Sequence, residues 1–134
     1  MKVYYSVTYA DNTVDYYIYA DYATKLSALF KAFPSGATIT LYADLTQTSA
    51  SMVSAVNGGN AYLDLNGKTL TATDTDYGVY ANSDLTITDS SAAGGGSLTG
   101  TANDEGSSGV GVQGIITVKG GTLSGTGDGY GVFA

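Results

Sequence analysis

The sequence of 134 residues contains no cysteine, no histidine and no tryptophan, and its five basic side chains are all lysines. Without cysteine there is no disulfide framework, and without thiolate or imidazole groups there is no zinc-type metal site. The missing histidine also excludes a Ser/His nucleophile system, and the missing arginine excludes a bidentate clamp for carboxylate or phosphate groups. These absences remove most of the common catalytic and metal-binding constellations.

Positive charge is also scarce, and this limits the possible partners. Twelve acidic residues against five lysines give a formal net charge of −7, whereas a protein that binds nucleic acid or an anionic membrane needs the opposite sign. No apolar run approaches the roughly 18 residues of a membrane helix. The first residues are not followed by an apolar region of signal-peptide length. We therefore expect no nucleic-acid partner and no membrane insertion.

Apolar residues are numerous enough for one packed core. Hydrophobic residues make up 43% of the chain and charged residues 13%, which is not the composition of a disordered chain. The length predicts a single compact domain. Tyrosines crowd into the first half and glycines into the second, so the composition changes near residue 36. This change divides the chain into segments 1–36 and 37–134.

Segment 1–36 is predicted to form a hairpin and a helix. Strand-forming residues fill 3–9 and 14–19, and a polar turn cluster separates them, which favours an antiparallel hairpin. Asp21 is expected to cap a helix over 22–33. A hairpin or a single helix is only marginally stable alone, so this ββα segment must pack on the rest of the chain. We expect it to cap the N-terminal end of that structure through the apolar helix face formed by Leu26, Leu29, Phe30 and Phe33.

Segment 37–134 contains an internal repeat. Short alternating strands recur at intervals of about 22 to 31 residues and are separated by Gly, Asn, Asp and Ser turns, a pattern typical of a solenoid. No helix-forming stretch lies within a unit, so a leucine-rich horseshoe fits poorly. Three short strands per coil fit better. A single coil cannot bury its own apolar residues, so we expect the coils to stack.

Stacked coils are expected to place apolar residues in four inward ladders, with Thr, Asp, Lys and Ser pointing outward between them. Glycines at the corners would supply positive φ angles. The expected ladders are Ile39, Leu63, Leu85 and Ile116; Leu41, Leu65, Ile87 and Val118; Leu45, Leu70, Leu98 and Leu123; and Val79, Val110 and Val132.

The repeated phrases resemble those of a known fold family. Residues 63–71 (LDLNGKTLT), 78–81 (GVYA), 85–91 (LTITDSS) and 118–125 (VKGGTLSG) are similar to the repeats of right-handed parallel β-helices. They resemble the pectate-lyase-like superfamily and, within it, adhesin-like surface proteins of gut bacteria. The resemblance covers roughly 37–134. It implies a mainly β protein, a right-handed parallel β-helix of about four partial coils with an N-terminal ββα cap.

The same resemblance leaves several functions open, because this fold hosts lyases, hydrolases, adhesins and phage spikes. It favours an extracellular or cell-surface location as part of a longer exported protein. The last unit, 130–134, lacks a covering element, so we expect the C-terminal coil either to continue in a longer solenoid or to self-associate.

Catalytic residues are not expected. Lyases of this fold use a basic group and an extended basic cleft, but only Lys68 and Lys119 lie in segment 37–134. Hydrolases use clustered carboxylates, yet the outward Asp64 is replaced by Thr86 and Thr117 in the next coils. We therefore predict a non-enzymatic protein without a cofactor. A fragment of a lyase or hydrolase and a phage fibre or spike segment, which would form a stable trimer, remain the alternatives.

Two groups of side chains are candidates for binding. Loop carboxylates suit a hard cation such as calcium, although Asp and Gly are also ordinary turn residues, and no metal site is expected. The weak calcium candidates are Asp74, Asp76, Asp104, Glu105 and Asp128. Outward aromatic rings can stack on sugars or form protein contacts, and those in the coils are Tyr62, Tyr77, Tyr80 and Tyr130. The sequence thus predicts a non-catalytic adhesin-like module with a glycan, or a host or neighbour protein, as its partner.

Overall fold

The computed structural model describes residues 2–19, 21–47, 51–53, 59–74 and 77–133, and it is mainly β. The described residues form one helix and fourteen strands. In chain order these are β1 (Tyr5–Thr8), β2 (Val14–Tyr17), α1 (Tyr22–Lys31), β3 (Thr38–Leu41), β4 (Leu45–Gln47), β5 (Ser51–Val53), β6 (Ala61–Asp64), β7 (Thr69–Asp74), β8 (Tyr77–Ala81), β9 (Leu85–Thr88), β10 (Ser97–Ala102), β11 (Ser108–Val112), β12 (Ile116–Val118), β13 (Thr122–Thr126) and β14 (Tyr130–Phe133).

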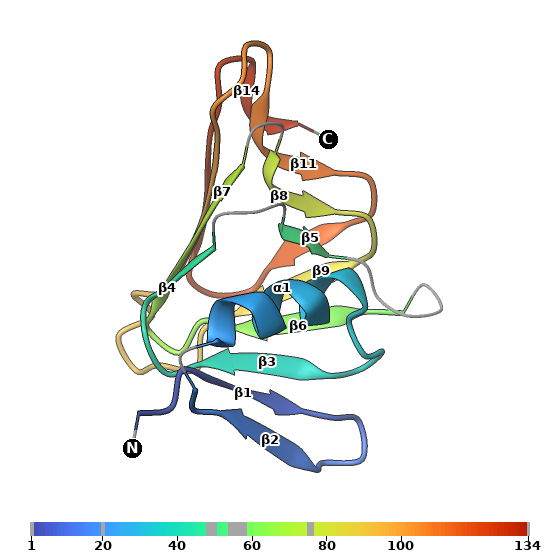
Figure 1. Ribbon diagram of the computed structural model, residues 1–134, viewed down its shortest axis with the longest axis vertical. Coiled ribbons are helices and arrows are strands. Elements are labelled where there is room, and N and C mark those ends of the chain that lie inside the picture. The colour runs from blue at the N-terminus through green and yellow to red at the C-terminus, as the bar shows by residue number, and fades with distance from the viewer. Residues whose placement is uncertain (1, 20, 48–50, 54–58, 75–76, 134) are drawn as a thin grey trace.

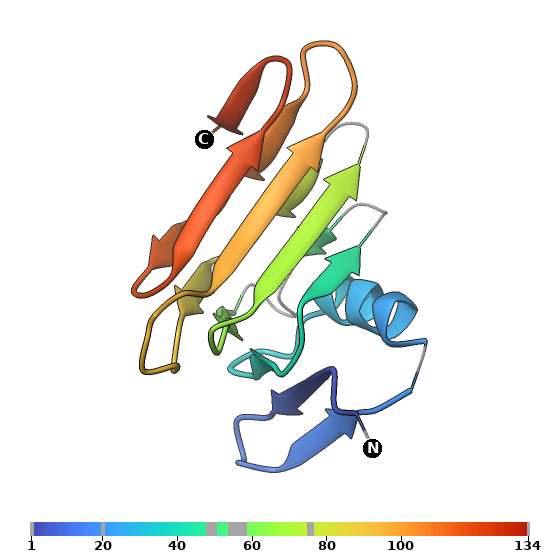
Figure 2. The ribbon, with the colours of Figure 1, turned by 90° about the vertical axis from the view of Figure 1, so that its left-hand side faces the viewer.

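Strands β3 to β14 wind into a β-solenoid, which confirms the predicted solenoid, and each of its three sheets contains four of these strands. Every third strand joins the same sheet, so each turn contributes one strand to each of three sheets. The strands within a sheet are parallel from β3 onward. Figure 2 shows β4, β7, β10 and β13 side by side with their arrows in one direction. The backbone of each inner coil is therefore paired with the coils before and after it.

The predicted ladders are correct in two of the sheets and wrong in part of the third. Leu45, Leu70, Leu98 and Leu123 are aligned as expected, and so are Val79, Val110 and Val132. In the sheet of β6 and β9, however, Leu63 lies opposite Ile87 and Ala61 lies opposite Leu85. The predicted register of β9 relative to β6 is thus off by two residues.

A shift of two keeps every apolar residue on the inward face, because side chains alternate with a period of two. Leu63 and Leu85 are both buried in the same core as a result. The Ala61 methyl occupies an inward position that the sequence prediction left empty.

The hairpin of β1 and β2 extends one sheet beyond the first strand of the coils. Strand β1 pairs antiparallel with β3, and β2 pairs antiparallel with β1. The sheet order is therefore β12-β9-β6-β3-β1-β2. Figure 1 shows this sheet running up the molecule from β2. The hairpin reverses the strand direction at this edge, and Tyr5 and Val7 of β1 are fully buried.

Helix α1 packs against β4 and β5, beside the first coil (Figure 1). Its Leu26 and Phe30, together with Phe33 after the helix, are buried in the same core as the inward residues of the coils. Leu29 is partly buried and packs against the same core. The helix ends at Lys31, two residues before the predicted end. Asp21 makes no capping hydrogen bond and instead forms an ion pair with Lys25.

Glycines allow two of the sheets to meet closely at one corner. A Cβ atom on Gly109 of β11 would lie 2.2 Å from the Thr126 nitrogen and 2.5 Å from the Gly100 carbonyl oxygen. A Cβ on Gly78 of β8 would lie 2.3 Å from the Thr101 nitrogen. Because these neighbours are backbone atoms, a side chain at either position has no room. The close approach explains much of the glycine in the second half of the chain.

Candidate binding cleft

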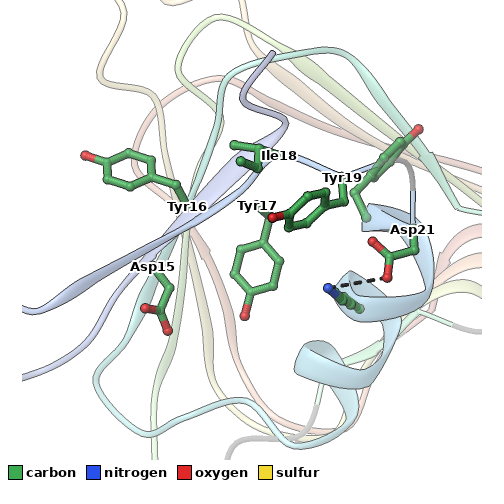
Figure 3. A pocket seen from close by; sticks show the side chains of 8 residues that line it. Asp15, Tyr16, Tyr17, Ile18, Tyr19 and Asp21 are labelled. Atoms are coloured by element: carbon green, nitrogen blue, oxygen red, sulfur yellow. Dashed lines mark ion pairs between the residues drawn. The ribbon is translucent and has the colours of Figure 1, made fainter. Parts of the chain in front are cut away.

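A cleft of about 210 Å³ lies between the edge strand β2 and the start of α1 (Figure 3). We call it the tyrosine cleft. A second hollow, bounded by Tyr17, Lys25 and the α1 residues Ala28, Leu29 and Ala32, continues along the helix. Tyr17 and Lys25 border both hollows, so together they form one groove beside α1. The residues that line the tyrosine cleft are Asp15, Tyr16, Tyr17, Ile18, Tyr19, Asp21, Tyr22 and Lys25.

Stacked aromatic rings fix the walls of the tyrosine cleft. The ring of Tyr17 lies 4.4 Å from that of Tyr5, with an interplanar angle of 14°. The ring of Tyr22 lies 4.3 Å from that of Tyr4, with an angle of 17°. Offset stacks of this kind are favourable and leave little rotational freedom. Tyr5 of β1 and Tyr4 just before this strand therefore position two cleft tyrosines, one from β2 and one from α1.

Two other tyrosines of this region remain open to solvent. The exposed fractions are 66% for Tyr19 and 60% for Tyr16. In Figure 3, Tyr16 points away from α1, whereas Tyr19 lies over the start of the helix. Tyr19 thus presents a largely exposed aromatic ring at the mouth of the cleft.

The charged groups of the cleft are acidic overall. The Lys25 ammonium lies 3.3 Å from Asp21 Oδ2 and 5.4 Å above the centre of the Tyr19 ring. Both partners of this ion pair are about half exposed, so it contributes little to stability. Asp15 accepts a hydrogen bond of 3.0 Å from the Tyr9 hydroxyl. Burial and this bond raise the pKa of Tyr9 to about 12, so its proton stays in place at neutral pH.

The arrangement can hold a small polar ligand with an apolar face. Tyrosine rings supply flat apolar surface, and carboxylates and hydroxyls supply hydrogen-bonding groups at its border. Binding sites are commonly built in this way, from aromatic walls with a few convergent polar groups.

The four coil tyrosines that the sequence singled out do not form one site. Tyr77 and Tyr80 are together on β8, with ring centres 5.0 Å apart, and the Tyr80 hydroxyl donates to Gln113 Oε1 at 3.0 Å. Tyr130 is on β14, two strands away, where its ring contacts that of Phe133. Tyr62 is on β6 in a different sheet. Their role in binding stays a prediction.

The calcium candidates are also dispersed. Asp74 ends β7, while Asp76 lies outside the described residues. Asp104 and Glu105 are exposed in the loop before β11, and Asp128 Oδ2 accepts a hydrogen bond from the Gly106 amide at 3.0 Å. In the described part of the chain, no three acidic side chains come together in a group that could hold a metal ion.

Most coil carboxylates instead tie one coil to the next. Asp44 accepts from the Thr69 amide, Asp84 from the Ile115 amide and Asp64 from the Ser90 amide, all at 2.8 to 3.0 Å. Each bond joins residues that are more than twenty positions apart. The turn acids thus satisfy backbone amides of the neighbouring coil.

Asp89 makes the densest set of such bonds. Its carboxylate accepts from the amides of Gly67, Ser91 and Gly96 and from the Ser91 hydroxyl. These bonds lower the pKa of Asp89 to about 2, and the bond from the Ser91 hydroxyl makes the largest contribution to this shift. The carboxylate is therefore ionised wherever the protein is folded near neutral pH.

Sequence reasoning did not find the tyrosine cleft. The cleft combines tyrosines of the hairpin with Tyr22 and Lys25 from α1. The signal present in the sequence was the density of tyrosines around residues 16–22. Within the described residues, no helix is long and apolar enough to cross a membrane. A comparison with protein-family models, with curated proteins and with solved structures finds no match to this chain.

Proposed function

We propose that this chain is a non-catalytic, adhesin-like surface module that binds a glycan in the tyrosine cleft. The observation that carries the proposal is the cleft itself, where tyrosine rings from β2 and α1 border a space of about 210 Å³ together with Asp15, Asp21 and Lys25. Aromatic surface next to hydrogen-bonding groups suits the two faces of a sugar ring.

The charge of the cleft favours a neutral or amino sugar as the ligand. Two carboxylates border it against one lysine, and that lysine is already paired with Asp21. The whole chain carries a net charge of −7. An acidic sugar would be repelled by this field, whereas a neutral or cationic sugar would not.

The use of the coil carboxylates supports a role without catalysis. Asp44, Asp64, Asp84 and Asp89 accept hydrogen bonds from backbone amides and hold neighbouring coils together. An acid–base pair needs two carboxyl groups that face one substrate. Carboxylates engaged as structural acceptors are poorly placed for that task.

The proposal includes a finer reading of the architecture. We infer a right-handed coil of the pectate-lyase-like type, with β1, β2 and α1 as its N-terminal cap, in a gut-bacterial protein displayed at the cell surface as part of a longer exported chain. The repeat phrases support the family, and the burial of Leu26, Phe30 and Phe33 against the first coil supports the cap. A rigid solenoid would hold the cleft at a distance from the cell surface on which the protein is displayed.

The test is glycan binding by the intact chain and by matched tyrosine variants. An array of neutral, amino and acidic oligosaccharides identifies a ligand, and calorimetric titration then gives its affinity. Tyr19→Ala is expected to weaken binding about tenfold, because a lost stacking contact costs roughly 1.4 kcal/mol. Tyr42→Ala is the control, since Tyr42 is 43% exposed and does not line the cleft.

Two results would contradict this assignment. If Tyr80→Ala or Tyr130→Ala abolishes binding and Tyr19→Ala does not, the ligand lies on the outer face of the coils. If no oligosaccharide in the array binds, glycan recognition is not the function, and a protein partner takes its place.

A further inference from the structure

The tyrosine cleft already holds an ammonium group, which belongs to the protein itself. The Lys25 ammonium lies 3.3 Å from Asp21 Oδ2, an ion pair drawn as a dashed line in Figure 3, and 5.4 Å above the centre of the Tyr19 ring. A carboxylate and an aromatic face are the groups with which proteins hold an organic ammonium ion. Lys25 thus marks a position in the cleft where a cation is stabilised.

We propose that the ligand of the tyrosine cleft is an oligosaccharide with free amino groups, one of whose ammonium groups takes the position of the Lys25 ammonium. This inference rests on the proposed glycan-binding function and narrows the ligand to one class of sugar. Lys25 is then an internal competitor, which fills the cation position until the ligand displaces it.

The ion pair of Lys25 is one that a ligand can replace at small cost. Asp21 precedes α1, but its side chain makes no capping hydrogen bond to the helix. The side chains of Lys25 and Asp21 are 46% and 56% exposed, and pairs with this exposure contribute little to stability. The flexible stem of a lysine lets its ammonium turn to the solvent. The Asp21 carboxylate can therefore change partners without a loss of fold.

A second lysine lies over a ring next to the cleft. The Lys2 ammonium is 4.9 Å from the centre of the Tyr4 ring, and this ring is stacked on that of Tyr22 with centres 4.3 Å apart. The negative face of an aromatic ring attracts a cation. Two of the five lysines of the chain therefore lie over tyrosines at or beside the cleft. This repetition indicates that the aromatic surface suits a cationic ligand.

The charge balance of the cleft favours one added cation. Its charged lining residues are Asp15, Asp21 and Lys25, which leave one net negative charge. A single ligand ammonium neutralises this charge, and the net charge of −7 on the whole chain attracts a cationic oligosaccharide at longer range. An N-acetylated sugar of similar shape carries no charge and cannot take the place of the Lys25 ammonium.

Lys25 also lies where the two hollows of the groove meet. It borders the tyrosine cleft and the hollow beside Ala28, Leu29 and Ala32. A ligand group in the position of its ammonium therefore lies between the two hollows. This placement favours a chain of sugars over a single ring.

The first test compares two forms of one oligosaccharide by calorimetric titration at low salt, where charge interactions are least screened. The probes are a glucosamine oligosaccharide with free amino groups and its N-acetylated counterpart of the same length. We expect the wild type to bind the amino form at least about tenfold more tightly. An oligolysine peptide of the same charge is the third probe. If the peptide binds as tightly as the amino oligosaccharide, the assignment to a sugar is wrong.

The second test removes the internal competitor. Lys25→Gln should bind the amino form about two- to fivefold more tightly than the wild type, because no exposed ion pair has to be broken. Lys31→Gln removes the same charge from the last turn of α1 and lines neither hollow, so it should gain less. Asp21→Asn should lose the preference for the amino form. In the Asp21→Asn background, Lys25→Gln should gain no more than Lys31→Gln.

The outcomes separate this inference from the proposed function. If both forms bind equally and Tyr19→Ala weakens both, the cleft binds glycan without an ammonium, and only this inference fails. The same holds if neither form binds but another oligosaccharide does so in a manner that depends on Tyr19. If Lys25→Gln weakens binding of the amino form, Lys25 contacts the ligand and is not a competitor. If Tyr19→Ala leaves the affinity for the amino form unchanged, the ligand lies elsewhere and both proposals fail.

Discussion

At the scale of single residues, Asp89 shows how this fold uses its acidic side chains. Its carboxylate joins the coil of β9 to the coil of β6 through the Gly67 amide, and it also orders the turn that leads to Gly96. Ionisation strengthens such bonds, because a carboxylate is a better acceptor than a carboxylic acid. The residue is thus a structural acceptor whose strength depends on its charge.

The lowered pKa makes stability depend on pH in a defined direction. The folded-state pKa of Asp89 is about 2, against an ordinary value of 3.8. Its contribution is therefore complete above the ordinary value and is lost as the pH falls through about 2. We predict that the melting temperature of the wild type falls more steeply between pH 4 and pH 2 than that of Asp89→Asn, which cannot titrate. Thermal melts followed by circular dichroism measure the difference.

Glu105→Gln is the control for this experiment, since Glu105 is an exposed loop acid. Its melting curve should keep the steep decline of the wild type. If wild type and Asp89→Asn lose stability in parallel below pH 4, the ionised Asp89 does not support the fold.

At the scale of elements, the close crossing of β10 and β11 makes a glycine indispensable. We predict that Gly109→Ala destabilises the protein by about 2 to 3 kcal/mol, because the added methyl would overlap backbone atoms of Gly100 and Thr126 that cannot move independently. Gly95→Ala is the matched control, since nothing lies within 4 Å of a Cβ there. Urea unfolding of both variants gives the comparison. Equal midpoints for the two variants would show that the corner can widen.

The elements themselves could be predicted from the sequence because their patterns are local. Alternating strand-forming residues predicted the hairpin, and apolar residues at helical spacing predicted α1. The repeated strand phrases predicted the solenoid. Register was harder, because a shift by two residues leaves the inward face unchanged and the sequence pattern cannot distinguish Leu63 opposite Leu85 from Leu63 opposite Ile87. Asp21 looked like a helix cap, but its carboxylate is drawn to Lys25 one turn away.

The tyrosine cleft could not be predicted because it depends on how two elements pack. Strand β2 is an edge strand that exposes most of its surface, and only the position of α1 turns that surface into a cleft. Tyr4 and Tyr5 determine where Tyr22 and Tyr17 lie. Those stacks join residues of three different elements, and no local pattern encodes them.

At the scale of the whole molecule, each coil is stabilised by its neighbours along the solenoid axis. Strands β6 to β10 have partners on both sides, whereas β12, β13 and β14 have a partner on one side only. We predict a gradient of hydrogen exchange in the monomer, with the strongest protection in β6 to β10 and the weakest in β12 to β14. Mass spectrometry of the exchanged protein at low concentration measures it. Uniform exchange along the chain would mean that the solenoid opens only as a unit.

The antiparallel pairing of β1 with β3 has a consequence for how such a stack can grow. Parallel, in-register strands stacked at one spacing are also the geometry of a cross-β fibril, in which every layer is a seed for the next. Strand β1 runs antiparallel to β3, and α1 packs against β4 and β5, so the layer on this side is not a copy of the first coil. Further parallel layers therefore cannot add there. The molecule is thus a polar stack, because the layer formed by the hairpin is not a copy of the coils and cannot seed a further parallel layer on its side.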